Sequence, residues 1–252
     1  MTDKRIVLVT GANGGIGRAT VLEFAKRGWQ VIGVDRDALG FDFPADGLFI
    51  QTDIANPENV AELFSQVAER YGRLDALVNN AAIQIAKPLV ETTLEEWDSL
   101  MAINLRAVFY SVKQAYPLLK KAEGAVVNVS SVHAVATSAD IASYAASKGA
   151  VMALTRAMAI EFAADNVRVN AILPGAVDTP MLEAGLSRGH VSGGTLEARK
   201  ADLARKTVIG RVGKPSEIAS AIVFLADNEQ SSFMTGHPML VDGGATIRLS
   251  TE

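Results

Sequence analysis

Short runs rich in Val, Ile and Leu recur along the chain, and most are separated by longer stretches with apolar residues at helical spacing. Such continuous apolar runs predict strands that are buried on both faces of a sheet. The first run, residues 6–9, leads into a glycine-rich turn and then into an amphipathic pattern from Ile16 that closes at Gly28. The chain therefore opens with a strand, a turn and a helix.

Further apolar runs predict the remaining strands at residues 29–35, 48–51, 74–78, 125–129, 168–173 and 238–241. The helical stretches between most of these runs are long enough to be crossover connections, so the strands should be parallel, with helices on both faces. The predicted fold is a doubly wound α/β domain on one seven-stranded sheet, in a single domain that spans residues 1–252.

Two stretches depart from this alternation. Residues 36–47 have the sequence RDALGFDFPADG, whose two Gly and one Pro leave no room for a full crossover helix, so a loop is expected. Residues 181–210 carry Gly185, Gly189, Gly193 and Gly194 among polar residues. We expect this second stretch to lie over the strand ends as a lid that orders over bound cofactor and substrate.

Composition narrows the possible functions. The 252 residues carry 24 Lys and Arg against 28 Asp and Glu, and 49% are hydrophobic, as in an ordinary globular domain. The chain has no basic tract, so neither a nucleic acid nor a membrane is expected as a partner. The absence of Cys excludes disulfides and thiolate chemistry, and the three His are scattered, so we expect no metal site. The first apolar run is too short for a signal peptide, which predicts a cytoplasmic location.

The turn after the first strand supplies a candidate phosphate site. Glycines at positions 11, 15 and 17, with Asn13 and Ile16 between them, leave backbone N–H groups and a helix N-terminus open to a pyrophosphate. A tight turn without a ligand is the alternative interpretation. The order strand, turn, helix favours a dinucleotide.

The end of the second predicted strand bears on which dinucleotide is bound. Asp35 stands 18 residues after Gly17, where a carboxylate can accept both ribose hydroxyls and would repel a 2′-phosphate. This favours NAD over NADP. Arg36 follows directly, and its guanidinium can pair with a 2′-phosphate, so NADP stays open as the alternative.

Candidate acid/base chemistry lies in the second half of the chain. Tyr144 and Lys148 are four residues apart, on one face of a predicted helix. A nearby cation stabilises phenolate and lowers the Tyr pKa, so that the phenol can exchange a proton with an alcohol or carbonyl oxygen. Ser131 follows a buried strand, and Asn104 lies inside an otherwise apolar helix, where its amide needs partners.

With these residues the chain closely resembles the short-chain dehydrogenase/reductase superfamily, whose motifs T-G-x3-G-x-G, N-N-A-G, mid-helix Asn, Ser, Y-x3-K and P-G run along most of it. The resemblance implies a Rossmann-type fold with Tyr144 as general acid/base and Ser131 orienting the reacting oxygen. It implies that Lys148 lowers the Tyr pKa and holds the nicotinamide ribose, and that Asn104 supports a water-linked proton relay behind Lys148.

The resemblance also implies the path of the cofactor. Asp53 and Ile54 are expected to contact adenine, the segment of Asn80, Ala81 and Ala82 to line the adenosine ribose, and the loop after the sixth strand to embrace the nicotinamide. The residues expected in that loop are Pro174, Gly175, Val177 and Thr179. Ala82 stands where the family usually has Gly. The short connection after Asp35 resembles more loosely the cytosolic type-2 3-hydroxybutyrate dehydrogenases and the dihydro-dihydroxybenzoate dehydrogenases, and residues 174–244 are similar to the former.

The expected function is that of an NAD-dependent oxidoreductase that interconverts a secondary alcohol, or the anomeric hydroxyl of a sugar, and its carbonyl form. An NADPH-dependent carbonyl or 3-oxoacyl-thioester reductase is the alternative enzyme, and a dinucleotide-sensing binding protein is the alternative outside enzymes. The intact set of four catalytic candidates argues against the sensor. The apolar helices that carry Asn104 and Tyr144, and the closing segment at residues 237–244, resemble faces by which the family packs into two-fold symmetric tetramers, so a homotetramer is expected.

The substrate is expected to be small and polyhydroxylated or anionic, such as a sugar, polyol or hydroxy acid, because a polar pocket rejects analogues that leave its groups unpaired. The candidate substrate residues are Gln84, Ser131, His133, Tyr144, Arg188 and Arg205.

Overall fold

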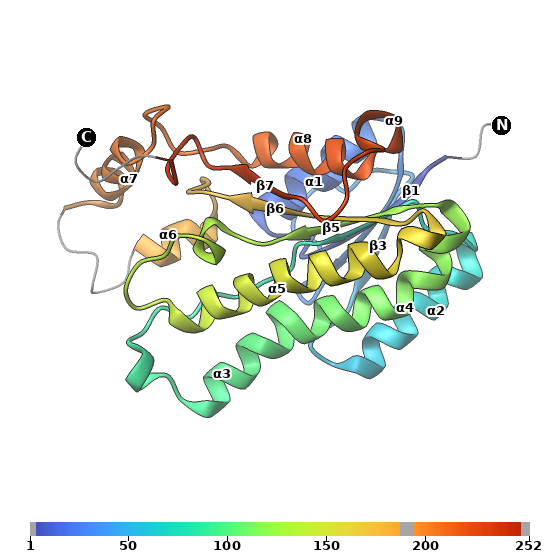
Figure 1. Ribbon diagram of the computed structural model, residues 1–252, viewed down its shortest axis with the longest axis horizontal. Helices are drawn as coiled ribbons and strands as arrows, with labels where there is room; N and C mark the ends of the chain where they lie inside the picture. Colours follow the sequence, from blue (N-terminus) through green and yellow to red (C-terminus); the bar gives the residue numbers. More distant parts are fainter. Residues whose placement is uncertain (1–3, 187–193, 248–252) are drawn as a thin grey trace.

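The computed structural model describes residues 4–186 and 194–247, and its centre is one parallel sheet of seven strands (Figure 1). The strands are β1 (Ile6–Thr10), β2 (Gln30–Asp35), β3 (Leu48–Gln51), β4 (Ala76–Asn79), β5 (Ala125–Val129), β6 (Arg168–Pro174) and β7 (Pro238–Val241). They lie in the order β3-β2-β1-β4-β5-β6-β7. The predicted doubly wound parallel sheet is therefore confirmed.

Helices cover both faces of this sheet (Figure 1). The α-helices are α1 (Gly15–Lys26), α2 (Pro57–Tyr71), α3 (Leu94–Met101), α4 (Ala107–Ala122), α5 (Ala142–Glu161), α6 (Pro180–Leu186), α7 (Leu196–Arg205), α8 (Pro215–Ala226) and α9 (Asn228–Ser231). Short helical turns are η1 (Leu89–Glu91), η2 (Ala102–Arg106), η3 (Val132–Ala134) and η4 (Ala163–Asp165). None of the helices in the described ranges is long and apolar enough to span a bilayer.

Alternation along the strands divides the core into two layers. Leu8 of β1 packs in the cluster that includes residues of α2, α4 and α5, whereas Val7 and Val9 pack in the cluster that includes residues of α1 and α8. Successive strand side chains point to opposite faces, so a strand covered on both sides must be apolar throughout. This is why the strands read as continuous apolar runs.

The chain places the next strands on opposite sides of β1. β2 and β3 lie on one side of β1, and β4 lies on the other with β5, β6 and β7 beyond it. Ligands of open α/β sheets bind outside the carboxyl ends of the strands at such a reversal. The candidate residues at Thr10–Gly17 and Asn80–Ala82 follow β1 and β4, so they meet at this point.

Residues 36–47 form a loop, as predicted, and β3 pairs in parallel with β2. Asn13 holds the loop against the glycine-rich turn, because its amide donates to the carbonyl oxygens of Asp37 (3.0 Å) and Ala38 (2.9 Å) and accepts the N–H of Gly40 (3.0 Å). Phe43 packs from the loop onto the core beneath. These contacts replace the missing crossover helix.

Three strands end one residue later than predicted, at Thr10, Asn79 and Pro174, and two strands start later than predicted. The run at 74–78 becomes β4 only from Ala76, since the Leu74 N–H donates to the carbonyl of Leu118 in α4. The run at 29–35 becomes β2 only from Gln30, since the Trp29 N–H donates to the Phe24 carbonyl at the end of α1. Both residues are buried and apolar, so the sequence pattern does not separate them from the strands.

Candidate active site

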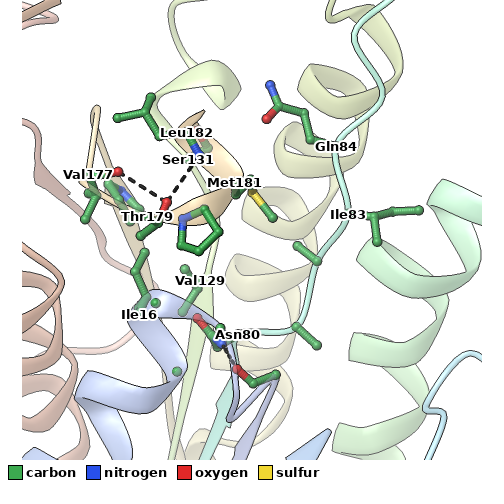
Figure 2. A pocket seen from close by; sticks show the side chains of 18 of the residues that line it. Ile16, Asn80, Ile83, Gln84, Val129, Ser131, Val177, Thr179, Met181 and Leu182 are labelled. Atoms are coloured by element: carbon green, nitrogen blue, oxygen red, sulfur yellow. Dashed lines mark hydrogen bonds between the residues drawn. The ribbon is translucent and has the colours of Figure 1, made fainter. Parts of the chain in front are cut away.

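A cavity of about 640 Å³ opens at the carboxyl ends of the strands. Figure 2 shows Ile16 of α1, Asn80 after β4 and Thr179 before α6 around it. Every residue predicted to contact the cofactor lines this cavity: Gly11, Asn13, Gly15, Ile16, Gly17, Asp35, Asp53, Ile54, Asn80, Ala81, Ala82, Tyr144, Lys148, Pro174, Gly175, Val177 and Thr179. The structure thus brings together residues from most of the chain.

The glycines of the first turn lie too close to neighbouring atoms of the protein to carry a side chain. A Cβ on Gly17 would lie 1.9 Å from the Gly11 carbonyl oxygen, and one on Gly15 would lie 2.6 Å from Cγ2 of Thr179. Gly11 has a φ of 67°, which favours glycine. No side chain caps the start of α1 and no acidic residue lies in its first turn. The cradle therefore fits the phosphates of a dinucleotide.

A hydrogen-bond network joins this turn to the end of β4. The Thr10 hydroxyl accepts the N–H groups of Asn80 (3.0 Å) and Ala81 (3.1 Å). The Asn80 amide donates in turn to the carbonyl oxygens of Thr10 (2.9 Å) and Gly11 (3.1 Å). Asn80 therefore holds the two sides of the crevice at a fixed separation.

Asp35 lies at the end of β2, lines the same cavity as Ser131 and Tyr144, and contacts the glycine-rich turn. Its carboxylate accepts the N–H groups of Asn13 (2.9 Å) and Asp37 (3.1 Å). Arg36 also lines the cavity, but its side chain is 64% exposed, with Nε 3.5 Å from the Asp37 carboxylate. Main-chain donors thus fix the position of the Asp35 carboxylate, whereas the Arg36 guanidinium is held by a weak, solvent-exposed ion pair.

Tyr144 and Lys148 extend into the cavity from the buried face of α5. Burial raises the pKa of Tyr144 to about 12, and a hydrogen bond with Ser131 opposes that rise. Burial lowers the pKa of Lys148 to about 8. The Lys148 ammonium lies 5.6 Å from the centre of the Tyr144 ring and donates to the carbonyl of Val129 (2.8 Å). A buried phenol, hydroxyl and ammonium are thus gathered at one wall.

Asn104 lies behind this wall, outside the residues that line the cavity. It belongs to η2, a π-helical turn between α3 and α4, and is 1% exposed. Its amide donates to the Ile83 carbonyl (2.9 Å) and the Ser147 hydroxyl (3.1 Å) and accepts the Ile83 N–H (2.9 Å). Ser147 donates to the Tyr144 carbonyl (2.7 Å). Asn104 therefore links the segment after β4 to the turn of α5 that carries Tyr144.

The substrate candidates have different positions. Gln84, Ser131 and His133 line the cavity. Arg205 does not: its guanidinium binds the Asp202 carboxylate at 3.0 Å and its side chain is 71% exposed. Leu203 of α7 and Lys206, which follows the helix, line the cavity instead. Arg188 lies outside the described residues.

Sequence reasoning missed several lining residues. They are Ile83, Ile103, Val132, Met181, Leu182, Leu203, Lys206, Thr207 and Ala245. Most are apolar and carry no motif, so only their position in the fold identifies them. No group of three or more His, Cys, Asp or Glu that could hold a metal ion occurs within residues 4–186 and 194–247.

Comparison with known proteins decides the family. Residues 11–246 match the family model described as enoyl-(acyl carrier protein) reductase. A 3-oxoacyl-[acyl-carrier-protein] reductase of Thermotoga maritima is 38% identical to this chain, over 96% of this chain and 98% of that relative. The chain belongs to the short-chain dehydrogenase/reductase superfamily. The motif-based resemblance is confirmed.

Other members of the superfamily are similar over nearly the whole chain. The meso-2,3-butanediol dehydrogenase of Serratia marcescens is 33% identical over 97% of this chain and 95% of its own. The ligand-free aldohexose dehydrogenase of Thermoplasma acidophilum superposes with a TM-score of 0.92 at 33% identity, over 98% of this chain and 96% of that one.

Two further solved structures carry a cofactor. ElxO with NADP bound has a TM-score of 0.86 at 30% identity, over 97% of this chain and all of that chain (100%). A 4-hydroxyisoleucine dehydrogenase complexed with NADH has a TM-score of 0.86 at 28% identity, over 98% and 100%. Members of this superfamily with similar folds therefore bind either nicotinamide dinucleotide.

Proposed function

We propose that the protein is an NAD-dependent oxidoreductase that interconverts a secondary alcohol, such as a sugar, polyol or hydroxy acid, and its ketone or lactone. The observation that carries the proposal is that Ser131, Tyr144 and Lys148 line the same cavity as the glycine cradle. The reaction needs a hydride acceptor beside a group that can take a proton, and this arrangement supplies places for both.

Each group at the cavity wall has a role in the proposed reaction. In alcohol oxidation the phenolate of Tyr144 takes the hydroxyl proton as the carbinol carbon loses a hydride, and Ser131 donates a hydrogen bond to the reacting oxygen. Bound NAD⁺ supplies the acceptor for the hydride. Lys148 stabilises the phenolate by its positive charge. In carbonyl reduction Tyr144 returns the proton.

We infer that protons reach Tyr144 from the side of α5 that faces away from the substrate. Lys148 is 3% exposed and contacts the Val129 carbonyl, and the Asn104 network lies behind it. A water chain beside Asn104 would connect the ammonium to solvent without opening the substrate side of the cavity.

NAD is the proposed cofactor because of Asp35. Its carboxylate is fixed by the N–H groups of Asn13 and Asp37 at the adenosine end of the cavity, where it would accept the ribose hydroxyls and repel a 2′-phosphate. The residues of the glycine cradle would hold the pyrophosphate. Titration of the protein with NADH and NADPH, followed by nucleotide fluorescence, tests this preference, and tighter binding of NADPH would overturn it.

The experiment that tests the activity is a screen for NADH formation. Aldoses, polyols, hydroxy acids and hydrophobic secondary alcohols are each incubated with the protein and NAD⁺. Turnover of at least one class is expected. A protein that binds NADH but oxidises no member of the screen and reduces none of the matching carbonyl compounds would contradict the proposal and favour a dinucleotide sensor.

An NADPH-dependent 3-oxoacyl-thioester reductase is the second candidate. The 38% identity to the Thermotoga maritima reductase and the position of Arg36 at the cavity favour it. Oxidation of NADPH in the presence of a short 3-oxoacyl thioester, faster than any NADH-linked reaction of the protein, would select this function.

We also propose that the chain acts as one domain in a cytoplasmic homotetramer. Phe109 on α4 is 50% exposed and Ile160 on α5 is 80% exposed, so apolar side chains are left uncovered on the two helices predicted to meet a second subunit. The lid proposed at 181–210 includes α6 and α7, while residues 187–193 lie outside the described ranges.

A further inference from the structure

Beyond Ser131 and Tyr144 the cavity has mainly apolar walls. Ile83, Val132, Met181, Leu182 and Leu203 line it there. Figure 2 shows Ile83 and Gln84 on the segment after β4 and Met181 and Leu182 on α6. A substrate with a compact hydrocarbon skeleton would bury apolar surface against these side chains.

The positive charges that line the cavity are occupied elsewhere. Within the described ranges they are Arg36, Lys148 and Lys206. The Arg36 guanidinium lies 3.5 Å from the Asp37 carboxylate, and the Lys148 ammonium donates to the Val129 carbonyl. The Lys206 ammonium lies 2.9 Å from the Asp202 carboxylate, and its side chain is 67% exposed. These cations do not compensate the loss of hydration of a substrate carboxylate.

His133 is a polar group held in place at this end of the cavity. Its Nδ1 lies 3.0 Å from the hydroxyl of Thr137, and its main-chain N–H donates to Ser131 (3.2 Å). Its ring packs edge-on against the ring of Tyr144, with centres 5.9 Å apart. Nε2 has no partner among the described residues. The His133 ring is thus fixed next to Tyr144, and its Nε2 is available for a hydrogen bond with the substrate.

The chemistry of that nitrogen matches an uncharged oxygen. Burial lowers the pKa of His133 and so favours the neutral ring over the imidazolium. Nε2 of a neutral ring is a donor or an acceptor according to the tautomer that Thr137 selects. A substrate hydroxyl can accept a hydrogen bond from Nε2 or donate one to it, whereas a carboxylate can only accept. The amide of Gln84, which has no hydrogen-bond partner in the described part of the chain, adds a donor and an acceptor.

We propose that His133 is a specificity-determining residue that binds a second, uncharged oxygen of the substrate on the carbon next to the reacting carbinol, and that Gln84 assists it. The preferred substrate is then a compact neutral vicinal diol or hydroxyketone. Thr137 is a positioning residue, because it reaches the substrate only through the His133 ring. This inference rests on the proposed function and narrows its substrate class from sugars, polyols and hydroxy acids in general.

The test compares substrates built on one ring. Wild-type protein is assayed with NAD⁺ and cis-cyclohexane-1,2-diol, cyclohexanol or cis-2-hydroxycyclohexanecarboxylate. The diol is expected to have a kcat/KM about tenfold above both others, the size of effect that one to two hydrogen bonds give. In His133→Phe, which keeps a ring beside Tyr144, the ratio of diol to cyclohexanol should fall about tenfold, through KM for the diol.

Two more variants keep the test decisive. Thr137 is exposed, so Thr137→Val should fold even if His133→Phe does not, and it should lower the same ratio about threefold because the ring is no longer oriented. Gln84→Leu should lower it as well. Binding is measured without turnover in a Tyr144→Phe background in the presence of NAD⁺. Adding His133→Phe to this background should weaken the affinity for the diol and leave the affinity for cyclohexanol unchanged.

The outcomes separate the two proposals. Three results would overturn the role of His133 and leave the oxidoreductase function standing. They are equal kcat/KM for diol and cyclohexanol, a preference for the hydroxy acid, or a diol-to-cyclohexanol ratio of kcat/KM that His133→Phe and Thr137→Val leave unchanged. Failure of the wild type to oxidise any of the three alcohols, or any other secondary alcohol, would overturn the proposed function itself.

Discussion

Tyr144 and Lys148 are buried side by side, and burial moves their pKa values in opposite directions, to about 12 and about 8. A protonated phenol cannot take a proton, so alcohol oxidation should accelerate as pH rises toward the pKa of Tyr144. A positive charge nearby favours the phenolate and lowers that pKa. We therefore expect the Lys148 ammonium to lower the pKa of Tyr144 during the reaction.

Replacing the ammonium tests this pairing. In Lys148→Ala the phenolate loses its stabilising charge, so the rising limb of the kcat–pH profile should move to higher pH and the rate at pH 7 should fall at least about 100-fold. Lys148→Arg keeps a cation and should move the limb less. An Ala variant with the wild-type pH limb would show that Lys148 does not act on Tyr144.

Asp35 is expected to decide cofactor choice. Asp35→Ala removes the carboxylate that would repel a 2′-phosphate, so the preference for NAD over NADP should fall by about tenfold or more, because specificity often rests on a repulsive element. Affinities of the two reduced nucleotides, measured by fluorescence, give the ratio. Arg36→Ala is the matched control and should raise the preference for NAD; the opposite pattern in the two variants would assign the choice to Arg36.

At the scale of elements, glycines in two helices provide a matched pair. A Cβ on Gly17 would enter the Gly11 carbonyl, whereas a Cβ on Gly149 in α5 would meet nothing within 4 Å. Gly149→Ala should stabilise the fold by about 0.5–1 kcal/mol through its helix propensity. Gly17→Ala should lose NADH binding and lower the melting temperature. Thermal unfolding and nucleotide titration measure both, and a Gly17→Ala protein that binds NADH normally would refute the cradle.

Periodicity predicted the elements well because each strand is covered on both faces. The loop at 36–47 was predictable from its Gly and Pro content, and Tyr144 and Lys148 from their helical spacing. The strand starts at Gln30 and Ala76 were missed because the preceding Trp29 and Leu74 are buried by helix contacts. The π-helical turn at Asn104 was also missed, and the partner of its amide, Ser147, lies 43 residues further along the chain.

At the scale of the whole molecule, the uncovered apolar side chains on α4 and α5 predict assembly. Light scattering at micromolar concentration should give four times the chain mass of 26.6 kDa. Phe109→Glu should reduce this mass by placing charge in the interface, while Leu22→Glu on α1, away from both predicted faces, should not. A monomer mass for the wild type would contradict the assembly.

The substrate end of the cavity was the hardest part to predict because it is built from segments that meet only in the folded chain. Polar residues of 181–210 were expected to line it, yet Arg205 points to Asp202 while Met181 and Leu203 line the cavity. Leu203 is the α7 residue that lines the cavity, and no motif in the sequence marks it. The motif residues were predictable because their chemistry requires particular residue types at fixed spacing.

The central claim is that Tyr144 is the acid/base of a dehydrogenase, and the rate of NADH formation by Tyr144→Phe tests it most directly. The change removes the hydroxyl and keeps the ring that packs beside His133, so NADH binding should persist. With saturating NAD⁺ and the best alcohol of the wild type, we expect kcat to fall at least about 1,000-fold, as for loss of an acid/base group. A rate within a few-fold of wild type would contradict the account.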